Sequence, residues 1–200
     1  KAKGDHAAAE PLYRRALETR ERVLGPEHPH TPSSVNNLAL LLKAKGDLAA
    51  AEPLYRRALG GRERVLGAEH PQTLTSVKNL AGLLHAKSDF AAAEPLYQRA
   101  LQARERVLGP EHPQTLTSLN NLASLLDEKG QLAAAEPLYR RALETRQRVL
   151  GPEHPDTLTS MNNLAGLLHA KGDSAAAEPL YRRALEAQER ALGPEHPLTL

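Results

Sequence analysis

The chain has 200 residues, of which 40% are hydrophobic, and its 26 basic and 24 acidic side chains give a formal net charge of +2. It contains no cysteine and no tryptophan, and only one phenylalanine, one methionine and five tyrosines. Disulfides and thiolate metal sites are therefore excluded. A core must be built mainly from Leu, Ala and Val, and Leu and Ala favour helices.

Basic and acidic residues are mixed along the chain, and opposite charges often stand four residues apart, as in Glu18 and Arg22. That spacing suits exposed helix faces, whereas a phosphate-binding surface needs Lys and Arg gathered on one face. We therefore expect no nucleic-acid partner. The longest apolar run, "LALLL" at 38–42, is too short to cross a membrane, and the chain opens with no targeting leader. We expect no membrane partner and, by default, a cytoplasmic location.

The chain is an array of repeats with a period of 42 residues. Residues 7–29 differ from residues 133–155 only in that Glu21 is replaced by Gln147. Repetition at a fixed period indicates a solenoid. We expect a single solenoid over residues 1–200, with a partial repeat at 1–29, whole repeats at 30–71, 72–113, 114–155 and 156–197, and the start of another at 198–200.

Each repeat is predicted to be a pair of antiparallel helices of roughly 14 and 19 residues. In the repeat 114–155, apolar residues at helical spacing define a first helix that ends near Gly130 and a second that ends at Gly151. Pro137 falls in the second turn of the second helix, where we expect it to bend the helix. The alternative is that this helix begins at the proline. One pair cannot bury both apolar stripes, so the pairs must stack.

The spacing within a repeat resembles that of the tetratricopeptide repeat. The positions that match its packing residues in the repeat 30–71 are Leu38, Ala39, Leu42, Gly46, Leu48, Ala51, Tyr55 and Ala58. The 42-residue unit and the string "NNLALLLKAKGDLAAAEPLYRRAL" resemble the kinesin light chain subgroup. The resemblance implies an all-α, right-handed superhelical solenoid whose first helices line a concave face that holds peptides or partner proteins.

The candidate peptide-binding site consists of first-helix residues that the apolar stripe does not use. They are Asn36, Asn37, Lys43, Thr75, Lys78, Asn79, His85, Thr117, Asn120, Asn121, Ser124, Asp127, Thr159, Asn162, Asn163 and His169. The asparagines form two columns, of which one is unbroken and the other is interrupted at Lys78. A carboxamide offers both a donor and an acceptor, so it can hold a peptide backbone. The alternative is that the amides bond to the adjacent helix pair and fix the stacking register.

The spacing of the asparagines favours one kind of ligand. Stacked helix pairs repeat at roughly 10 Å, and three residues of polyproline II advance about 9.3 Å. A Pro-containing or irregular extended peptide would therefore show the same face to successive asparagines, with room for it beside Gly82, Ser124 and Gly166. Only Lys78 is suitably placed for a terminal carboxylate, so we do not expect that mode of recognition. The column with the most variation, Lys43, His85, Asp127 and His169, is predicted to carry the specificity.

A Glu-His pair recurs every 42 residues in the segment "LGPEHP" or "LGAEHP", with its histidines at 28, 70, 112, 154 and 196. Copies roughly 10 Å apart cannot share one ion, because ligands must lie within about 2.0–2.2 Å of it. We therefore expect no catalytic residue, no metal and no cofactor, and hence no enzyme. Each histidine is instead predicted to cap a helix that begins at the following proline. The alternative caps are Thr73, Thr115 and Thr157.

Two function classes remain. The first is a scaffold that binds a peptide segment or a partner protein. The second is a structural protein that self-assembles end to end into a filament, because the sequence shows no polar capping repeat to cover the apolar ends of the solenoid.

Overall fold

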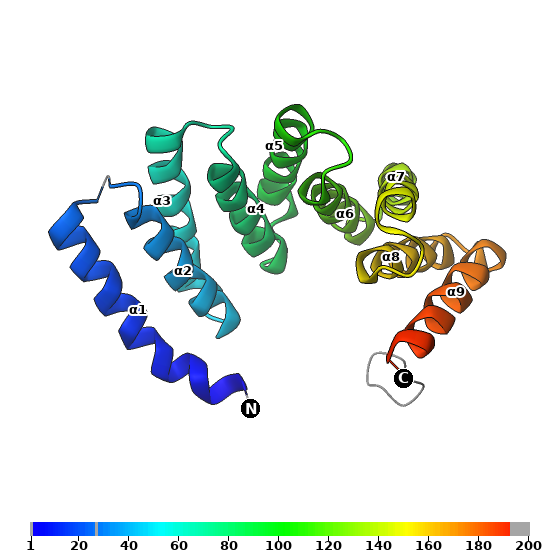
Figure 1. Ribbon diagram of the computed structural model, residues 1–200, viewed down its shortest axis with the longest axis horizontal. Coiled ribbons are helices and arrows are strands. Elements are labelled where there is room, and N and C mark those ends of the chain that lie inside the picture. Colours follow the sequence, from blue (N-terminus) through cyan, green and yellow to red (C-terminus); the bar gives the residue numbers. More distant parts are fainter. Residues whose placement is uncertain (1, 27, 193–200) are drawn as a thin grey trace. The chain divides into compact units, whose positions relative to one another are not determined.

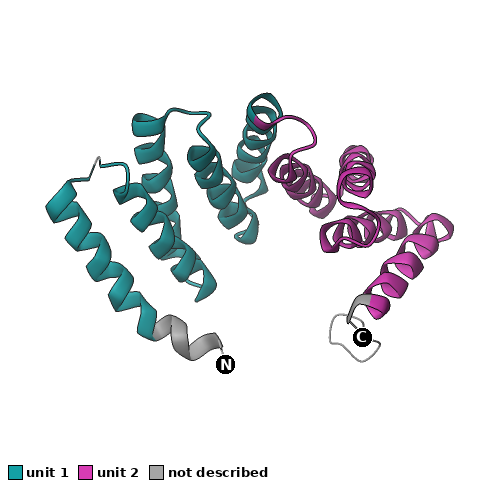
Figure 2. Cartoon of the chain, in the orientation of Figure 1, with its two compact units in different colours: residues 1–107 teal, residues 108–200 magenta. Residues whose placement is uncertain are grey.

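The computed structural model describes the backbone of residues 2–26 and 28–192, and the side chains of residues 8–26 and 28–190. Over this part of the chain the backbone forms nine α-helices and no strand (Figure 1). The predicted all-α repeat array is therefore confirmed. The chain divides into two compact units, residues 1–107 and 108–200 (Figure 2), which are described in turn.

The first unit contains five helices. They are α1 (Ala2–Leu24), α2 (Thr31–Ala44), α3 (Leu48–Leu66), α4 (Pro71–Ala86) and α5 (Phe90–Leu108). Helix α2 packs against both α1 and α3, and α3 also packs against α4. Each helix pair thus covers the apolar face of its neighbour, as a stacked array requires.

The second unit repeats this arrangement with four helices. They are α6 (Pro113–Glu128), α7 (Leu132–Leu150), α8 (Pro155–Ala170) and α9 (Ser174–Leu192). Helix α7 packs between α6 and α8, and α9 packs on α8. The first helices, α6 and α8, also contact each other directly.

The core is made of leucines and alanines around one tyrosine in each of α3, α5 and α7. Tyr55, Tyr97 and Tyr139 are only 0%, 4% and 3% exposed, and Ala51, with no exposed surface, lets neighbouring helices approach closely. Burial raises the pKa of Tyr55 and of Tyr139 to about 12, since the phenolate would lose its hydration.

The helix boundaries follow the glycine and proline signals. Gly130 and Gly151, which follow α6 and α7, have positive φ values of 75° and 92°, a conformation that glycine adopts without steric cost. Helices α6 and α7 have 16 and 19 residues, close to the predicted lengths. Pro137 lies inside α7, which begins at Leu132, so the prediction that the helix starts before the proline is confirmed.

Candidate functional site

The candidate site lies on the first helices, and two of its asparagines join adjacent helix pairs in the first unit. The Nδ2 of Asn79 on α4 donates to the Oδ1 of Asn36 on α2 at 3.0 Å. Asn36 and Asn79 are 4% and 9% exposed. This bond is the contact expected if the asparagines fix the stacking register, and it leaves both amides little access to a ligand.

Asn120 in the second unit makes a related contact. Its Nδ2 donates to the Oγ of Ser160 on α8 at 3.3 Å, and the side chain is 8% exposed. Its Oδ1 is buried and accepts no hydrogen bond within the described part of the chain. Asn120 therefore also links neighbouring first helices.

The other four asparagines are accessible. Asn37 is exposed, and Asn121, Asn162 and Asn163 are half-buried. Their carboxamides make no hydrogen bond to other residues that the structure describes. We use "first-helix face" for the polar positions on the first helices of one unit, which are α2 and α4 in the first unit and α6 and α8 in the second.

The three threonines of the candidate set are engaged within their own helices. The hydroxyls of Thr75, Thr117 and Thr159 each donate to the carbonyl of the proline four residues earlier at 2.9 Å. Each hydroxyl keeps its lone pairs, so these threonines can still accept a hydrogen bond from a ligand.

The first-helix face of the first unit is basic. The Nζ of Lys43 on α2 donates to the carbonyl of Gly82 on α4 at 3.0 Å. Lys78 is half-buried, and burial, Arg104 and Lys43 together hold its pKa below the usual lysine value. The predicted room beside Gly82 is partly filled, because a Cβ at this position would lie 3.5 Å from the Nζ of Lys43 and from the hydroxyl of Tyr97.

The corresponding face of the second unit carries acidic groups on α6. Burial and the neighbouring Glu128 raise the pKa of Asp127, and the Oγ of Ser124 bonds to Glu128 at 3.4 Å. The variable column of Lys43, His85, Asp127 and His169 thus carries a lysine in the first unit and an acidic residue in the second. This difference in charge is consistent with its predicted role in specificity.

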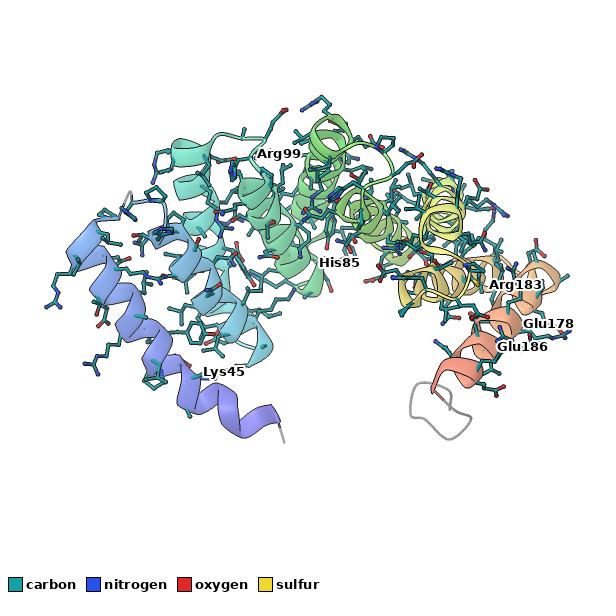
Figure 3. All side chains as sticks on the ribbon, in the orientation of Figure 1. Lys45, His85, Arg99, Glu178, Arg183 and Glu186 are labelled. Atoms are coloured by element: carbon teal, nitrogen blue, oxygen red, sulfur yellow. The ribbon has the colours of Figure 1, made fainter. Side chains whose placement is uncertain are left out.

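The two histidines of that column have different surroundings. His85 on α4, which is labelled in Figure 3, packs edge-on against Phe90 and Tyr97 with ring-centroid distances of 5.6 and 6.0 Å. His169 on α8 is exposed, and its Nδ1 lies 3.4 Å from the Oγ of Ser174. His85 is therefore tied to aromatic packing, whereas His169 is open to a partner.

The recurring Glu-His pairs act as structural connectors. The Nδ1 atoms of His70, His112 and His154 each accept a hydrogen bond from the backbone N–H two residues later at 3.2 Å, so the predicted capping role is confirmed at these three positions. At His28 the prediction is wrong, because α2 begins at Thr31 and its N-cap is His30, which makes no side-chain cap bond. Helices α4, α6 and α8 begin at the following prolines. His196 lies outside the described residues.

The neighbouring glutamates and threonines hold the same connectors. Glu111 and Glu153 form ion pairs with Arg148 and Arg190 of the next second helix, at 2.6 and 2.9 Å. The Thr115 hydroxyl donates to the carbonyl of Gly109 at 2.8 Å, so it ties the new helix to the end of the previous one and does not act as the cap. The described residues hold no group of three His, Asp or Glu side chains that could bind a metal ion.

Two buried arginines also join neighbouring helices, and the sequence alone did not indicate them. Arg62 and Arg146, 7% and 4% exposed, donate to Ser76 and Ser160 of the following first helix at 2.7 Å. Burial lowers the pKa of both guanidinium groups. In the sequence, the only sign of these bonds is that each Arg precedes its Ser partner by 14 residues. This spacing predicts a contact only when the stacking of the helices is already known.

The comparisons with known proteins agree with this architecture. The sequence model of the family described as "Tetratricopeptide repeat" matches residues 1–64, 32–101, 76–148, 128–190 and 162–200, which together span the chain. A comparison with curated proteins gives no match.

Among the helices of the described residues, none is long and apolar enough to cross a membrane.

Several solved structures are similar. A putative kinesin light chain from Podosopora anserina with nearly identical TPR-like repeats has a TM-score of 0.82 and 26% identity, over 94% of this chain and 90% of that one. BtubC (BKLC) from P. vanneervenii has a TM-score of 0.83 and 28% identity, over 98% and 77%. MamA from Desulfovibrio magneticus RS-1, 18% identical with a TM-score of 0.62 over 96% and 99%, shows the fold alone. The predicted resemblance to the kinesin light chain subgroup is confirmed.

Proposed function

On the premise that this chain belongs to the tetratricopeptide repeat family, whose members are generally protein-interaction scaffolds, we propose that it binds an extended peptide segment of a partner protein on its first-helix face. This face is the one that we expect to be concave. Proteins of this family are typically not enzymes, and the role that we propose for this chain is to bind a partner and not to catalyse a reaction.

One observation carries the proposal. Asn37, Asn121, Asn162 and Asn163 are accessible or half-buried, and their carboxamides have no partner among the described residues. Because these amides are at least partly exposed, a ligand can reach them. A peptide backbone offers both the donors and the acceptors that such amides lack.

The shape of the ligand follows from the repeat. First helices stacked at roughly 10 Å match the advance of about 9.3 Å over three residues of polyproline II. A peptide in this conformation meets successive asparagines in phase, whereas an extended strand alternates its faces. We therefore expect Pro-containing or irregular extended segments to bind best.

The test is a titration of the 200-residue chain with a displayed library of Pro-containing extended peptides, followed by calorimetry on the selected sequences. Replacement of Asn121 and Asn163 by Ala should weaken binding about tenfold or more, since each substitution removes about 1 kcal/mol or more of hydrogen bonding.

The matched control is Asn79→Ala. It removes a buried cross-repeat bond, so it should lower the melting temperature more than it lowers affinity. Unchanged affinity in the Asn121 and Asn163 variants would rule out the face.

A second candidate function, end-to-end self-association, has its own supporting observation. Tyr181 and Leu185 on α9 are each 42% exposed and line a shallow pocket of about 570 Å³. Their counterparts on α3, Tyr55 and Leu59, are 0% and 8% exposed. Exposed apolar groups of this kind favour contact with another surface.

Sedimentation velocity over a wide range of protein concentration tests this candidate. Self-association should raise the sedimentation coefficient with concentration, and Tyr181→Glu should abolish the rise. A constant monomer would remove this candidate and leave the peptide-binding proposal untouched.

A further inference from the structure

A ladder of ion pairs joins consecutive second helices. Arg57 on α3 forms an ion pair with Glu21 on α1, and Arg99 on α5 pairs with Glu63 on α3 at 2.6 Å. Both pairs join positions 36 residues apart, so they are copies of one contact. At the corresponding position of the second unit the glutamate is replaced by Gln147, opposite Arg183 on α9.

Arg183 is left without an acidic partner as a result. It is exposed and makes no ion pair with any described residue, including Glu186 three residues along the same helix. Glutamine can accept a hydrogen bond but carries no charge to match a guanidinium. Among the described residues, Arg183 therefore occupies the arginine position of the ladder without an acidic partner.

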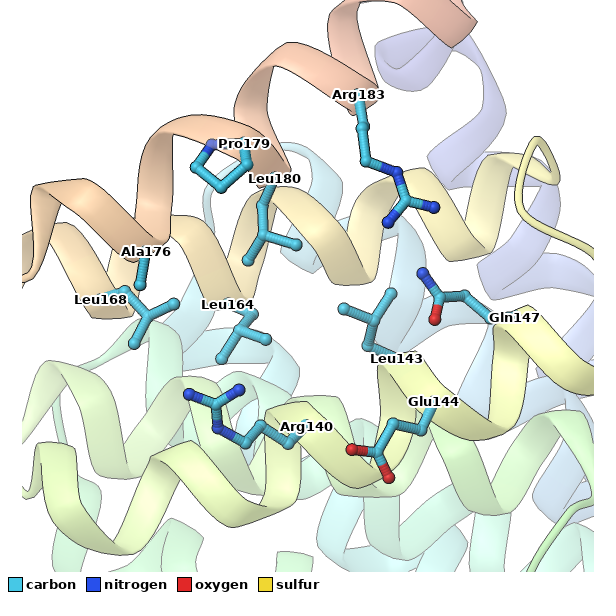
Figure 4. Close-up of a pocket in the computed structure, with 10 residues that line it drawn as sticks. All are labelled: Arg140, Leu143, Glu144, Gln147, Leu164, Leu168, Ala176, Pro179, Leu180 and Arg183. Atoms are coloured by element: carbon cyan, nitrogen blue, oxygen red, sulfur yellow. The ribbon is translucent and has the colours of Figure 1, made fainter.

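A pocket of about 320 Å³ lies at this point, between α7 and α9, and its floor comes from α8 (Figure 4). Apolar side chains form most of its lining, namely Leu143, Leu164, Leu168, Ala176, Pro179 and Leu180. Arg183 and Gln147 lie together at one end of it. A second pocket of about 220 Å³ also has Arg183 in its lining, so the guanidinium stands where the two pockets meet.

The charged side chains of the lining are Arg140, Arg183 and Glu144, so the lining has a net positive charge. Arg140 pairs with Glu136 at 2.7 Å, a carboxylate that also pairs with Lys171. Glu144 is exposed on the α7 side and makes no ion pair among the residues described. In Figure 4, Gln147 lies nearest Arg183, and Glu144 stands on α7 between Gln147 and Arg140.

We propose that this groove is a docking site for an acidic segment of a partner protein, which places a leucine-sized side chain over Leu164 and Leu168 and a carboxylate on Arg183. The chemistry of the ligand is taken from the chain itself. At Arg99 the same guanidinium position is occupied by the carboxylate of Glu63. An Asp or Glu of the partner therefore supplies the carboxylate that Gln147 lacks. This carboxylate can accept two parallel hydrogen bonds from the guanidinium group of Arg183. The site is separate from the first-helix face.

The first unit provides a matched control. Its equivalent groove has the same residues at all lining positions except two, because Gly60 and Glu63 replace Glu144 and Gln147. Gly60 removes the carboxylate that Glu144 places at the other groove, and this change alone would favour an anion. The ion pair of Glu63 with Arg99 is therefore the difference that closes the position in the first unit to an anion.

The probe is a library of short peptides that mix Leu with Asp and Glu, with a charge-reversed library that carries Lys in place of the acids. The parent chain should bind acidic members at one site. Gln147→Glu gives Arg183 an internal partner and should weaken that binding at least about tenfold. Glu63→Gln frees Arg99 and should raise the stoichiometry measured by calorimetry from one to two.

Several outcomes would overturn the proposal. They are equal binding of the charge-reversed library, unchanged affinity in Gln147→Glu, and unchanged stoichiometry in Glu63→Gln. A dimer of the peptide-free chain that is lost in Gln147→Glu would also overturn it, because the groove would then be filled by a second copy. Asn121→Ala with Asn163→Ala should leave this binding unchanged, which separates it from binding on the first-helix face.

Discussion

At the scale of single residues, the recurring histidine shows how one side chain can serve the backbone. The Nδ1 of His112 accepts from the backbone N–H of Gln114, and His70 and His154 make the same bond. Each bond satisfies one of the free N–H groups at a helix start. Any residue with an acceptor at the same reach should therefore replace the imidazole.

His112→Asn should leave stability nearly unchanged, because asparagine is a strong N-cap, whereas His112→Ala should lose about 0.5–2 kcal/mol. Denaturant unfolding of the two variants beside the parent chain measures the difference. Equal losses in both variants would show that the imidazole stabilises the helix start by packing and not by its hydrogen bond.

The sequence alone did not show which asparagines are buried between helices and which are accessible. The sequence places Asn36 and Asn37 side by side, yet Asn36 is 4% exposed and Asn37 is exposed. Neighbours on a helix differ by about 100° in direction, so one faces the next helix pair and the other faces solvent. Which one is buried depends on the crossing of stacked helices, and no residue of the sequence encodes that crossing by itself.

At the scale of elements, much of the fold could be read from the repeat itself. The 42-residue period and its recurring glycines predicted the helix ends near Gly130 and at Gly151. The second-helix length was predicted correctly, and the proline in its second turn lies inside the helix, as expected. Contacts between helices were harder to predict, as the buried Arg62 and Arg146 show, because they depend on residues brought together only by stacking.

The two adjacent glycines of α3 make a prediction at this scale. A Cβ on Gly60 would meet only the Nη1 of Arg64, at 3.6 Å, whereas a Cβ on Gly61 would lie 2.9 Å from the Cγ of Pro32 on α2. Gly60→Ala should therefore stabilise the chain by about 0.5–1 kcal/mol through the lost entropy of the unfolded state. Gly61→Ala should be less stable than Gly60→Ala by about 1–3 kcal/mol, because the core must shift.

Chemical denaturation of both variants measures these values, and Pro32→Ala provides the control. The double variant with Gly61→Ala and Pro32→Ala should recover the stability of Pro32→Ala or exceed it, since the clashing Cγ is gone. Equal gains from the two glycine substitutions would contradict the close packing of α2 on α3.

At the scale of the whole molecule, stability is shared by copies of the same small contacts. Glu52 accepts from Arg56 on its own helix and from Lys87 on the following helix pair, at 2.9 and 2.5 Å, and Glu136 bonds to Arg140 and Lys171 in the same way. These hydrogen bonds hold the pKa of each carboxyl below its usual value. Each exposed pair contributes little alone, but the array repeats it.

The repeated pairs predict how stability depends on pH. A carboxyl whose pKa is lowered by folding stabilises the chain fully above its unfolded pKa of about 4.5, and this contribution disappears as the pH falls through the lower folded value. The melting temperature should therefore fall steadily below about pH 4.5. Glu136→Gln should lower it at pH 7 by at most about 4 °C, since a surface pair contributes about 1 kcal/mol or less. It should also make the fall of the melting temperature at acid pH less steep, because one titrating pair is gone.

The control is Glu144→Gln. Glu144 lies on the same helix but makes no ion pair among the described residues, so this variant should keep the pH dependence of the parent chain. Thermal melts followed by circular dichroism from pH 7 to pH 3 make the comparison, and a Glu136→Gln profile parallel to the parent would show that these pairs do not set acid stability.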